Sequence, residues 1–213
     1  MKHRPLFAYA TAALLAITTV QVACGTPANA EPDGIPSKTL ATSDLNKLTV
    51  ADWTHSSSYV RTLFPTWDTD ANHCDTRESV LWRDAAEAER DTDTCEILSG
   101  TWYSPYDGAT WTSASKLDID HIVPLKNAWE SGAWAWTTAK RELFANDLVG
   151  TQLIAVTGTV NRAKGDQSPD AWKPPLADYY CTYAEMWISS KFKWSLTITK
   201  AEKTALTAML ATC

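Results

Sequence analysis

Asp118-Ile119-Asp120-His121-Ile122-Val123-Pro124 is the stretch that decides the fold, and Asn161-Arg162-Ala163-Lys164-Gly165-Asp166 follows it further along the chain. The first stretch alternates apolar and polar residues as a short strand does, and it carries an acid beside an imidazole. These two groups can supply a metal ligand and a general base, and the distant Asn161 can add an oxygen ligand for a hard cation. We therefore expect one site assembled from two segments.

His121 and Asp120 suit different tasks. An imidazole has an unperturbed pKa of about 6.5, so much of His121 is neutral near pH 7 and can take a proton from water. A carboxylate of ordinary pKa is a poor base there, but Asp120 is a good ligand for Mg²⁺ or Mn²⁺. The amide oxygen of Asn161 adds no charge, so the ion keeps positive charge for a phosphate. Together these groups fit phosphodiester hydrolysis.

Other charged side chains near the motifs have expected roles. Arg162 and Lys164 are cations suited to phosphate, and we expect Lys164 to contact it. Asp118 shares a strand face with Asp120, so it either supports the metal ligands or is a solvated carboxylate. Arg77 either reaches a phosphate or forms an ion pair with a neighbouring carboxylate.

The two motifs, with Gln152 shortly before Asn161, resemble those of HNH nucleases of the ββα-metal type. They are similar in particular to the HNH domain of RNA-guided CRISPR effectors, whose motifs also read D-x-D-H-I-V-P and N-R-x-K-x-D. Beyond the motifs, residues from about 59 to 213 look like the secreted HNH endonucleases of actinobacteria and fungi. That group is related to the C-terminal domain of the GmrSD restriction enzymes.

The resemblance implies a role for each motif residue. His121 would be the general base, and Asp120 and Asn161 would bind one divalent cation, Mg²⁺ first and Mn²⁺ second. Gln152 stands where the family usually has an Asn that holds the catalytic imidazole or its backbone. This is a departure, because Gln carries the same amide on a stem that is longer by one methylene. Lys164 would complete the catalytic set.

The resulting functional prediction is a secreted, metal-dependent endonuclease that cuts nucleic acid, DNA first and RNA second, with little sequence specificity. The alternative is a disulfide-stapled extracellular binding module, for carbohydrate or another polymer, that retains an inactive HNH fold. The net charge of −6 argues against a protein that coats nucleic acid tightly, since such proteins are usually basic. It does not argue against an enzyme that must release its product. We expect a monomer.

The N-terminus predicts export. Residues 1–30 have a basic start, an apolar run and a small-residue cleavage site ending at Ala30, which is typical of a signal peptide. A lipoprotein anchor at Cys24 is the rival interpretation. After Ala30 no apolar run is long enough to span a membrane. Residues 31–38 are expected to form a disordered leader, and residues 39–213 a single HNH endonuclease-like domain.

Four cysteines remain after the predicted signal peptide, and four cysteines allow three pairings. We predict Cys74–Cys95 and Cys181–Cys213. The second pair has a geometric reason, because Cys213 lies on the apolar face of a predicted terminal helix and Cys181 on that of another. An oxidising compartment favours disulfides over a metal site.

The predicted fold class is α+β. It has a ββα-metal core of short strands and a helix, surrounded by several α-helices and stapled by disulfides. A helical stripe is expected near Ala41, a hairpin turn at 104–108, and a short helix that carries Asn161. Strands are expected at 117–123 and 152–156, and other helices at 76–88, 126–132, 137–146, 178–191 and from Thr199 onward.

Overall fold

The computed structural model describes Met1, residues 31–70 and residues 73–213. Its α-helices are α1 Lys38–Lys47, α2 Thr76–Asp84, α3 Leu125–Glu130, α4 Thr138–Ala145, α5 Gly158–Lys164, α6 Tyr180–Lys193 and α7 Lys200–Leu210. Its strands are β1 Ala85–Arg90, β2 Ile97–Ser104, β3 Ala109–Trp111, β4 Leu117–His121 and β5 Leu153–Thr157. Short 3₁₀ helices are η1 Ser56–Ser58, η2 Arg61–Leu63, η3 Ala114–Lys116, η4 Ala133–Ala135 and η5 Ala177–Tyr179. The mixture of helices and small antiparallel sheets confirms the α+β class.

Strands β4 and β5 form a two-stranded antiparallel sheet, in which Asp120 lies opposite Ile154 and His121 opposite Leu153. Every residue of β5 is buried, as its apolar run predicts. Helix α5 begins directly after β5 and packs against both strands. Two strands and a helix thus form the expected ββα unit, and both motifs lie on it.

Glycines define both ends of α5. A Cβ atom at Gly158 would lie 2.9 Å from both Asp118 Oδ1 and Arg162 Nη1, so only glycine leaves room for these side chains to meet there. Gly165 follows the helix with a φ of 54°, a left-handed conformation that glycine adopts without strain.

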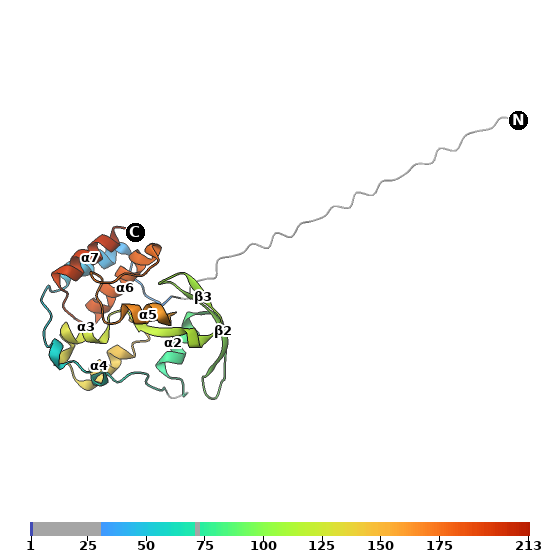
Figure 1. Cartoon of the computed structure of the whole chain (residues 1–213), viewed down its shortest axis with the longest axis horizontal. Helices are drawn as coiled ribbons and strands as arrows, with labels where there is room; N and C mark the ends of the chain where they lie inside the picture. Colours follow the sequence, from blue (N-terminus) through green and yellow to red (C-terminus); the bar gives the residue numbers. More distant parts are fainter. Residues whose placement is uncertain (2–30, 71–72) are drawn as a thin grey trace.

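Two hydrophobic clusters flank the ββα unit. The larger is built mainly from α3, α4, α6 and α7 and includes Phe144 and Trp187. The smaller joins α2 and the antiparallel sheet β1-β2-β3 to β4 and β5, and in it Trp102 donates its indole N–H to the carbonyl of Leu81. Figure 1 shows α3, α4, α6 and α7 on one side of α5 and the strands β2 and β3 on the other. The motif-bearing unit therefore lies between the two clusters.

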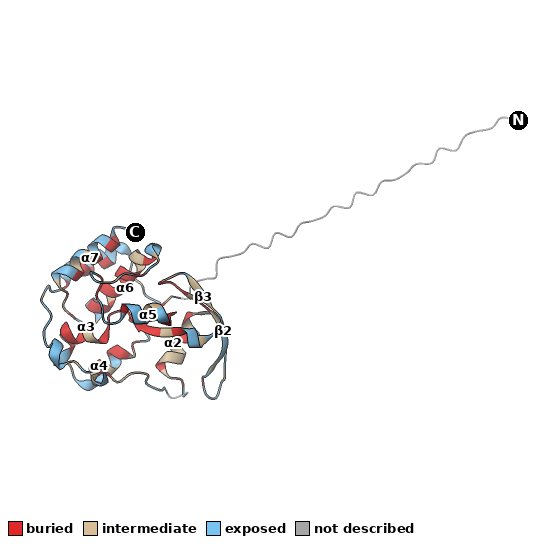
Figure 2. Ribbon diagram, in the orientation of Figure 1, coloured by how far each residue is buried: buried red, intermediate tan, exposed pale blue. Residues whose placement is uncertain are grey.

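A buried ion pair joins α6 and α7. Lys191 Nζ lies 3.2 Å from Glu202 Oε1, and both side chains are fully buried. Burial lowers the pKa of Lys191, and the charge of Glu202 opposes this shift. Glu202 also accepts the backbone N–H of Thr199, which completes the capping box predicted at the start of α7. Figure 2 shows exposed residues on the outer side of α7 and buried ones toward α6.

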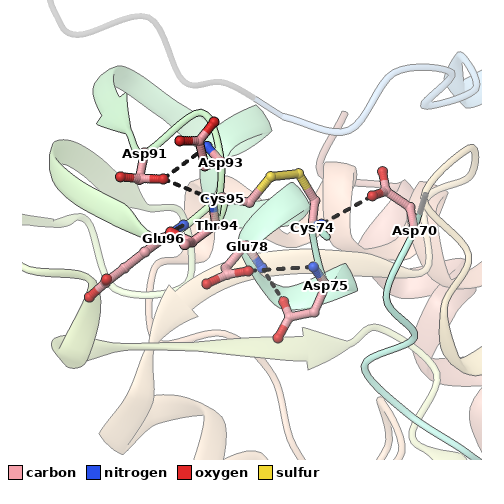
Figure 3. Close-up of a disulfide and its surroundings, with 9 residues drawn as sticks. All are labelled: Asp70, Cys74, Asp75, Glu78, Asp91, Asp93, Thr94, Cys95 and Glu96. Atoms are coloured by element: carbon pink, nitrogen blue, oxygen red, sulfur yellow. Dashed lines mark hydrogen bonds between the residues drawn. A yellow bond between two sulfur atoms is a disulfide. The ribbon is translucent and has the colours of Figure 1, made fainter. Parts of the chain in front are cut away.

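Both predicted disulfides are confirmed. Cys74–Cys95 connects the residue before the N-cap of α2 to the turn between β1 and β2. Figure 3 shows acidic side chains around this bridge, and they hold the local backbone: Asp75 and Glu78 form the capping box of α2, and Asp91 accepts the N–H groups of Asp93 and Thr94. Cys181–Cys213 connects the first turn of α6 to the C-terminus beyond α7.

Replacing Cys181 and Cys213 together with serine should lower the free energy of unfolding by about 3 kcal/mol, because the open chain gains entropy when unfolded. Urea unfolding followed by tryptophan fluorescence measures this loss against the oxidised wild type. Equal midpoints for the two proteins would show that the bridge does not stabilise the α6–α7 pair.

Two regions differ from the expectations, and a third lies outside the described residues. The helix expected at 76–88 ends at Asp84, because Ala85–Arg90 pairs with β2 as strand β1. In the stretch expected to be a disordered leader, Pro32 is buried, Ile35 packs against the larger cluster and α1 begins at Lys38. The predicted signal peptide, with Cys24 and the cleavage after Ala30, lies outside the described residues apart from Met1. Within the described part of the chain, no helix is both long and apolar enough to cross a membrane.

Candidate active site

A cavity of about 300 Å³ opens where β4 ends. β4 contributes Asp120 and His121 to its wall, and α5 contributes Asn161 and Arg162. Arg61 from η2 lines it as well. The two sequence motifs therefore meet at one place, and a third segment of the chain joins them.

His121 is buried and held from two sides. Its Nε2 lies 2.9 Å from the carbonyl oxygen of Ala145 at the end of α4, and its ring stacks on Trp67 with centroids 5.7 Å apart. A carbonyl oxygen only accepts hydrogen bonds, so Nε2 carries the proton and Nδ1 of the neutral ring keeps a lone pair. Burial lowers the pKa of His121 to about 3, against the hydrogen bond to Ala145, which raises it. The imidazole is therefore neutral at pH 7.

We expect His121 to remain the neutral Nε2–H tautomer from about pH 7.5 down to about pH 4.5, because its pKa lies below this range. Since the unfolded chain takes up this proton first, the imidazole also disfavours the folded state as the pH falls below its ordinary value of about 6.5. Long-range ¹⁵N–¹H correlation spectra of the metal-free protein, assigned with His121→Ala, report both tautomer and titration. A midpoint near pH 6.5 would contradict the buried, neutral imidazole.

Asp120 accepts hydrogen bonds from two buried side chains. The Tyr106 hydroxyl donates to Oδ2 at 2.5 Å, and Lys164 Nζ donates to both carboxylate oxygens at 2.8 Å. Lys164 also donates to the backbone carbonyl of His121 at 2.8 Å. Burial raises the pKa of Asp120, and the charge of Lys164 opposes this shift. The carboxylate is thus fixed in one orientation at the cavity wall.

Lys164 and Arg77, for which a phosphate contact was considered, form contacts within the protein instead. Lys164 is fully buried, and its three N–H groups are taken by Asp120 and by the His121 carbonyl. Its ammonium therefore neutralises Asp120 and does not face the cavity. Arg77 donates to the carbonyls of Ala114 and Leu117, which ties α2 to the start of β4. These contacts of Arg77 are thus to backbone carbonyls, and not to the phosphate or the carboxylate that the sequence suggested.

Asp118 organises the exposed edge of the site. Its Oδ2 accepts hydrogen bonds from Arg162 Nη1 at 2.8 Å and from Asn161 Nδ2 at 3.5 Å. The bond from its amide nitrogen orients Asn161, so the amide oxygen points away from Asp118. The Arg162 side chain is 65% exposed, so this ion pair is accessible to solvent and of modest strength.

Gln152 holds the backbone immediately after the motif strand. Its Nε2 donates to the Val123 carbonyl at 2.7 Å, and its Oε1 accepts the Val123 N–H at 3.2 Å. Ser190 from α6 donates to the same Oε1 at 2.6 Å, and Gln152 is fully buried. These contacts give Gln152 the backbone-holding position that the resemblance implies for an orienting amide.

Asp120 and Asn161 each keep an oxygen lone pair of the kind that a hard divalent cation binds. After its hydrogen bonds, Asp120 keeps a lone pair on Oδ1. Within the described residues, Asn161 Oδ1 accepts no hydrogen bond. Among those residues, the one group of three His, Cys, Asp or Glu side chains close enough to hold a metal includes the bonded Cys181 and Cys213. These two oxygens are the protein ligands that an ion such as Mg²⁺ would use here, with water and phosphate as its other ligands.

Sequence reasoning missed several residues of the site. Tyr106 was read only as part of a hairpin turn, yet it is fully buried and bonds Asp120. Trp67 belongs to no motif. It lies in a loop, has a φ of 60° and stacks on the ring of His121. Arg61 lies in a segment without any periodic pattern. These contacts depend on loop conformation, which no signal in the sequence specifies.

Comparison with known protein families assigns the chain to one of them. The family described as GmrSD restriction endonucleases, C-terminal domain, matches residues 75–209, which is more than half of the chain. The chain belongs to this family. The resemblance to the GmrSD C-terminal domain is thereby confirmed, and the protein is of a nuclease-related family. The matched residues include both motifs and Gln152, whereas Arg61 and Trp67 lie before them.

A similar protein is known from a fungus. The chain is 53% identical over 200 residues to an uncharacterized secreted protein of Arthroderma benhamiae, and the alignment covers 93% of this chain and 98% of that protein. No solved structure matches the chain significantly.

Proposed function

We propose that this protein is a secreted, divalent-metal-dependent endonuclease that hydrolyses phosphodiester bonds of nucleic acid, DNA first, with little sequence specificity. One observation carries the proposal: His121 and Asp120 from β4 and Asn161 from α5 line the same cavity, and the imidazole is neutral with Nε2 bonded to the backbone. A general base and two oxygen ligands within one cavity are what hydrolysis of a phosphodiester requires.

The reaction follows from the tautomer of His121. Its Nδ1 takes a proton from water, and the resulting hydroxide oxygen forms a bond to phosphorus as the bond to the 3′ oxygen breaks. The 3′ oxygen leaves and takes up a proton from solvent, so the products carry a 5′-phosphate and a 3′-hydroxyl. The Ala145 carbonyl keeps the ring oriented during the step, because it fixes Nε2. Gln152 fixes the backbone that follows His121.

Asp120 and Asn161 would hold the divalent cation, Mg²⁺ first and Mn²⁺ second. When bound, such an ion stabilises the negative charge on the phosphate and on the leaving oxygen. Tyr106 and Lys164 keep the Asp120 carboxylate in place. Because the protein offers few ligands, we expect the ion to bind weakly and to be removed readily by chelators.

The proposed substrate class is based on the family of the chain, and the proposed location on the fungal relative and the disulfides. Restriction endonucleases act on DNA, which favours DNA over RNA. The name of the fungal relative and the two disulfides support export to an oxidising compartment. The acidic net charge fits an enzyme that releases its product quickly and does not coat nucleic acid.

Product analysis tests the proposed chemistry. End-labelled DNA and RNA duplexes are incubated with the protein and Mg²⁺, and the new ends are mapped by ligation and phosphatase treatment. We expect internal cuts in DNA that leave a 5′-phosphate. Ends with a 3′-phosphate would overturn the proposed attack. Intact duplexes together with binding to a polysaccharide would instead favour the inactive binding module.

A further inference from the structure

Arg61 is a cavity residue that comes from outside the matched family domain. It begins η2, lies fourteen positions before residue 75 and lines the same cavity as His121 and Asn161. Its side chain is exposed, so the guanidinium can meet a ligand from solution. The N-terminal segment therefore contributes a cation to the mouth of the site.

The backbone that carries Arg61 is fixed. Phe64, directly after η2, is 2% exposed and lies in the larger hydrophobic cluster. Arg141 from α4 donates its Nε–H to the carbonyl of Leu63 at 2.7 Å. On the other side, Tyr59 packs against the same cluster, and its hydroxyl interacts with the Arg61 guanidinium. A guanidinium on an anchored turn loses little freedom when it binds a ligand.

The other cations of the site are already committed. Lys164 is buried on Asp120, and Arg162 is paired with Asp118 at 2.8 Å. No carboxylate in the described part of the chain forms an ion pair with Arg61. The cavity also contains the carboxylates of Asp120 and Asp166, which repel a phosphate. Arg61 is therefore the cation of this cavity whose charge no carboxylate pairs with among the described residues, and it is left to face an entering polyanion.

We propose that Arg61 binds the non-bridging oxygens of the phosphodiester that enters this cavity. The planar guanidinium presents parallel N–H groups that match two phosphate oxygens, which a lysine ammonium does not do. The N-terminal segment with η2 is then part of the substrate site, although it lies outside the family domain. This inference rests on the proposed function, because it assumes a phosphodiester as the ligand.

Binding and cleavage are measured separately to test Arg61. Binding uses a short fluorescent DNA duplex with Mg²⁺, in a His121→Ala background that prevents turnover. Adding Arg61→Ala should weaken binding at least tenfold and lower the slope of log Kd against log salt by about 1. Arg61→Lys should restore only part of the affinity. The matched control is Arg90→Ala. Arg90 is the last residue of β1, its guanidinium lies over the ring of Trp82 from α2, and it does not line the cavity.

The outcomes separate this inference from the proposed function. Arg61→Ala in the otherwise wild-type chain should lower kcat/KM at least tenfold, with an unchanged thermal midpoint because the side chain is exposed. If the wild type cuts DNA and Arg61→Ala binds and cuts like Arg90→Ala, Arg61 is not the phosphate ligand and the nuclease assignment stands. If nothing is cut but binding depends on Arg61, hydrolysis fails and the phosphate contact stands. If DNA is not cut and its binding does not depend on Arg61, both the nuclease function and the Arg61 phosphate contact are wrong.

Discussion

Replacing His121 with alanine is expected to slow cleavage of DNA about 10³-fold, because the water in the cavity then has no base. Neither Asp120 nor Lys164 takes over this task. The Asp120 carboxylate has its lone pairs largely occupied by Tyr106 and Lys164, and Lys164 is an ammonium that cannot accept a proton. Initial rates of nicking of supercoiled plasmid by wild type and variant give the ratio directly.

His55→Ala is the matched control for this substitution. His55 is exposed and its ring stacks on Trp134 with centroids 3.8 Å apart, so its loss removes an imidazole without touching the cavity. We expect wild-type nicking from this variant. Added free imidazole should partly restore nicking by His121→Ala, since the substitution leaves space for it. A His121→Ala rate within tenfold of the wild type would show that another group is the base.

Replacing Lys164 with methionine should lower the free energy of unfolding by about 3–5 kcal/mol, because it leaves the carboxylate of Asp120 buried without its cation. Asp120 is 5% exposed and would keep only the hydrogen bond from Tyr106. Urea unfolding measures the loss. The double variant Asp120→Asn with Lys164→Met should recover part of it, since the uncompensated charge is then absent.

Lys193→Met is the control for the buried pair. Lys193 donates to both oxygens of Asp147 at 2.8 and 2.7 Å, as Lys164 does to those of Asp120, but its side chain is 43% exposed. We expect a loss below about 1 kcal/mol there. If Lys164→Met cost no more than this and instead weakened DNA binding, Lys164 would be the phosphate ligand expected from the sequence.

The parts of the fold that were predictable are those set by local pattern. The alternation around Ile119 and the apolar run ending at Val156 predicted the two motif strands, and their order before Asn161 predicted the ββα unit. The capping box at Thr199 follows from spacing within one helix turn, and the Cys181–Cys213 pairing was predicted from the apolar faces of two separate helices. Each of these patterns spans only a few neighbouring residues, so a single sequence is enough to recognise it.

The missed features depend on contacts between distant segments. The Ala- and Glu-rich stretch 85–90 favours a helix on its own, yet pairing with β2 makes it a strand. Lys164 was assigned to phosphate by its motif, whereas its place on the inner side of α5 buries it against Asp120. Arg61 reaches the cavity only because Phe64 and Arg141 anchor η2. Strand pairing decides the first case, side-chain direction the second and loop placement the third, and none of these follows from residue spacing.

The most direct test of the central claim is metal-dependent nicking of supercoiled plasmid by the wild-type protein. Incubation with Mg²⁺ should convert the plasmid to nicked and then linear forms, EDTA should stop the conversion, and excess Mg²⁺ should restore it. Undiminished nicking in EDTA would contradict a cation held by Asp120 and Asn161. An intact plasmid with both Mg²⁺ and Mn²⁺ would contradict the assignment of this cavity to phosphodiester hydrolysis.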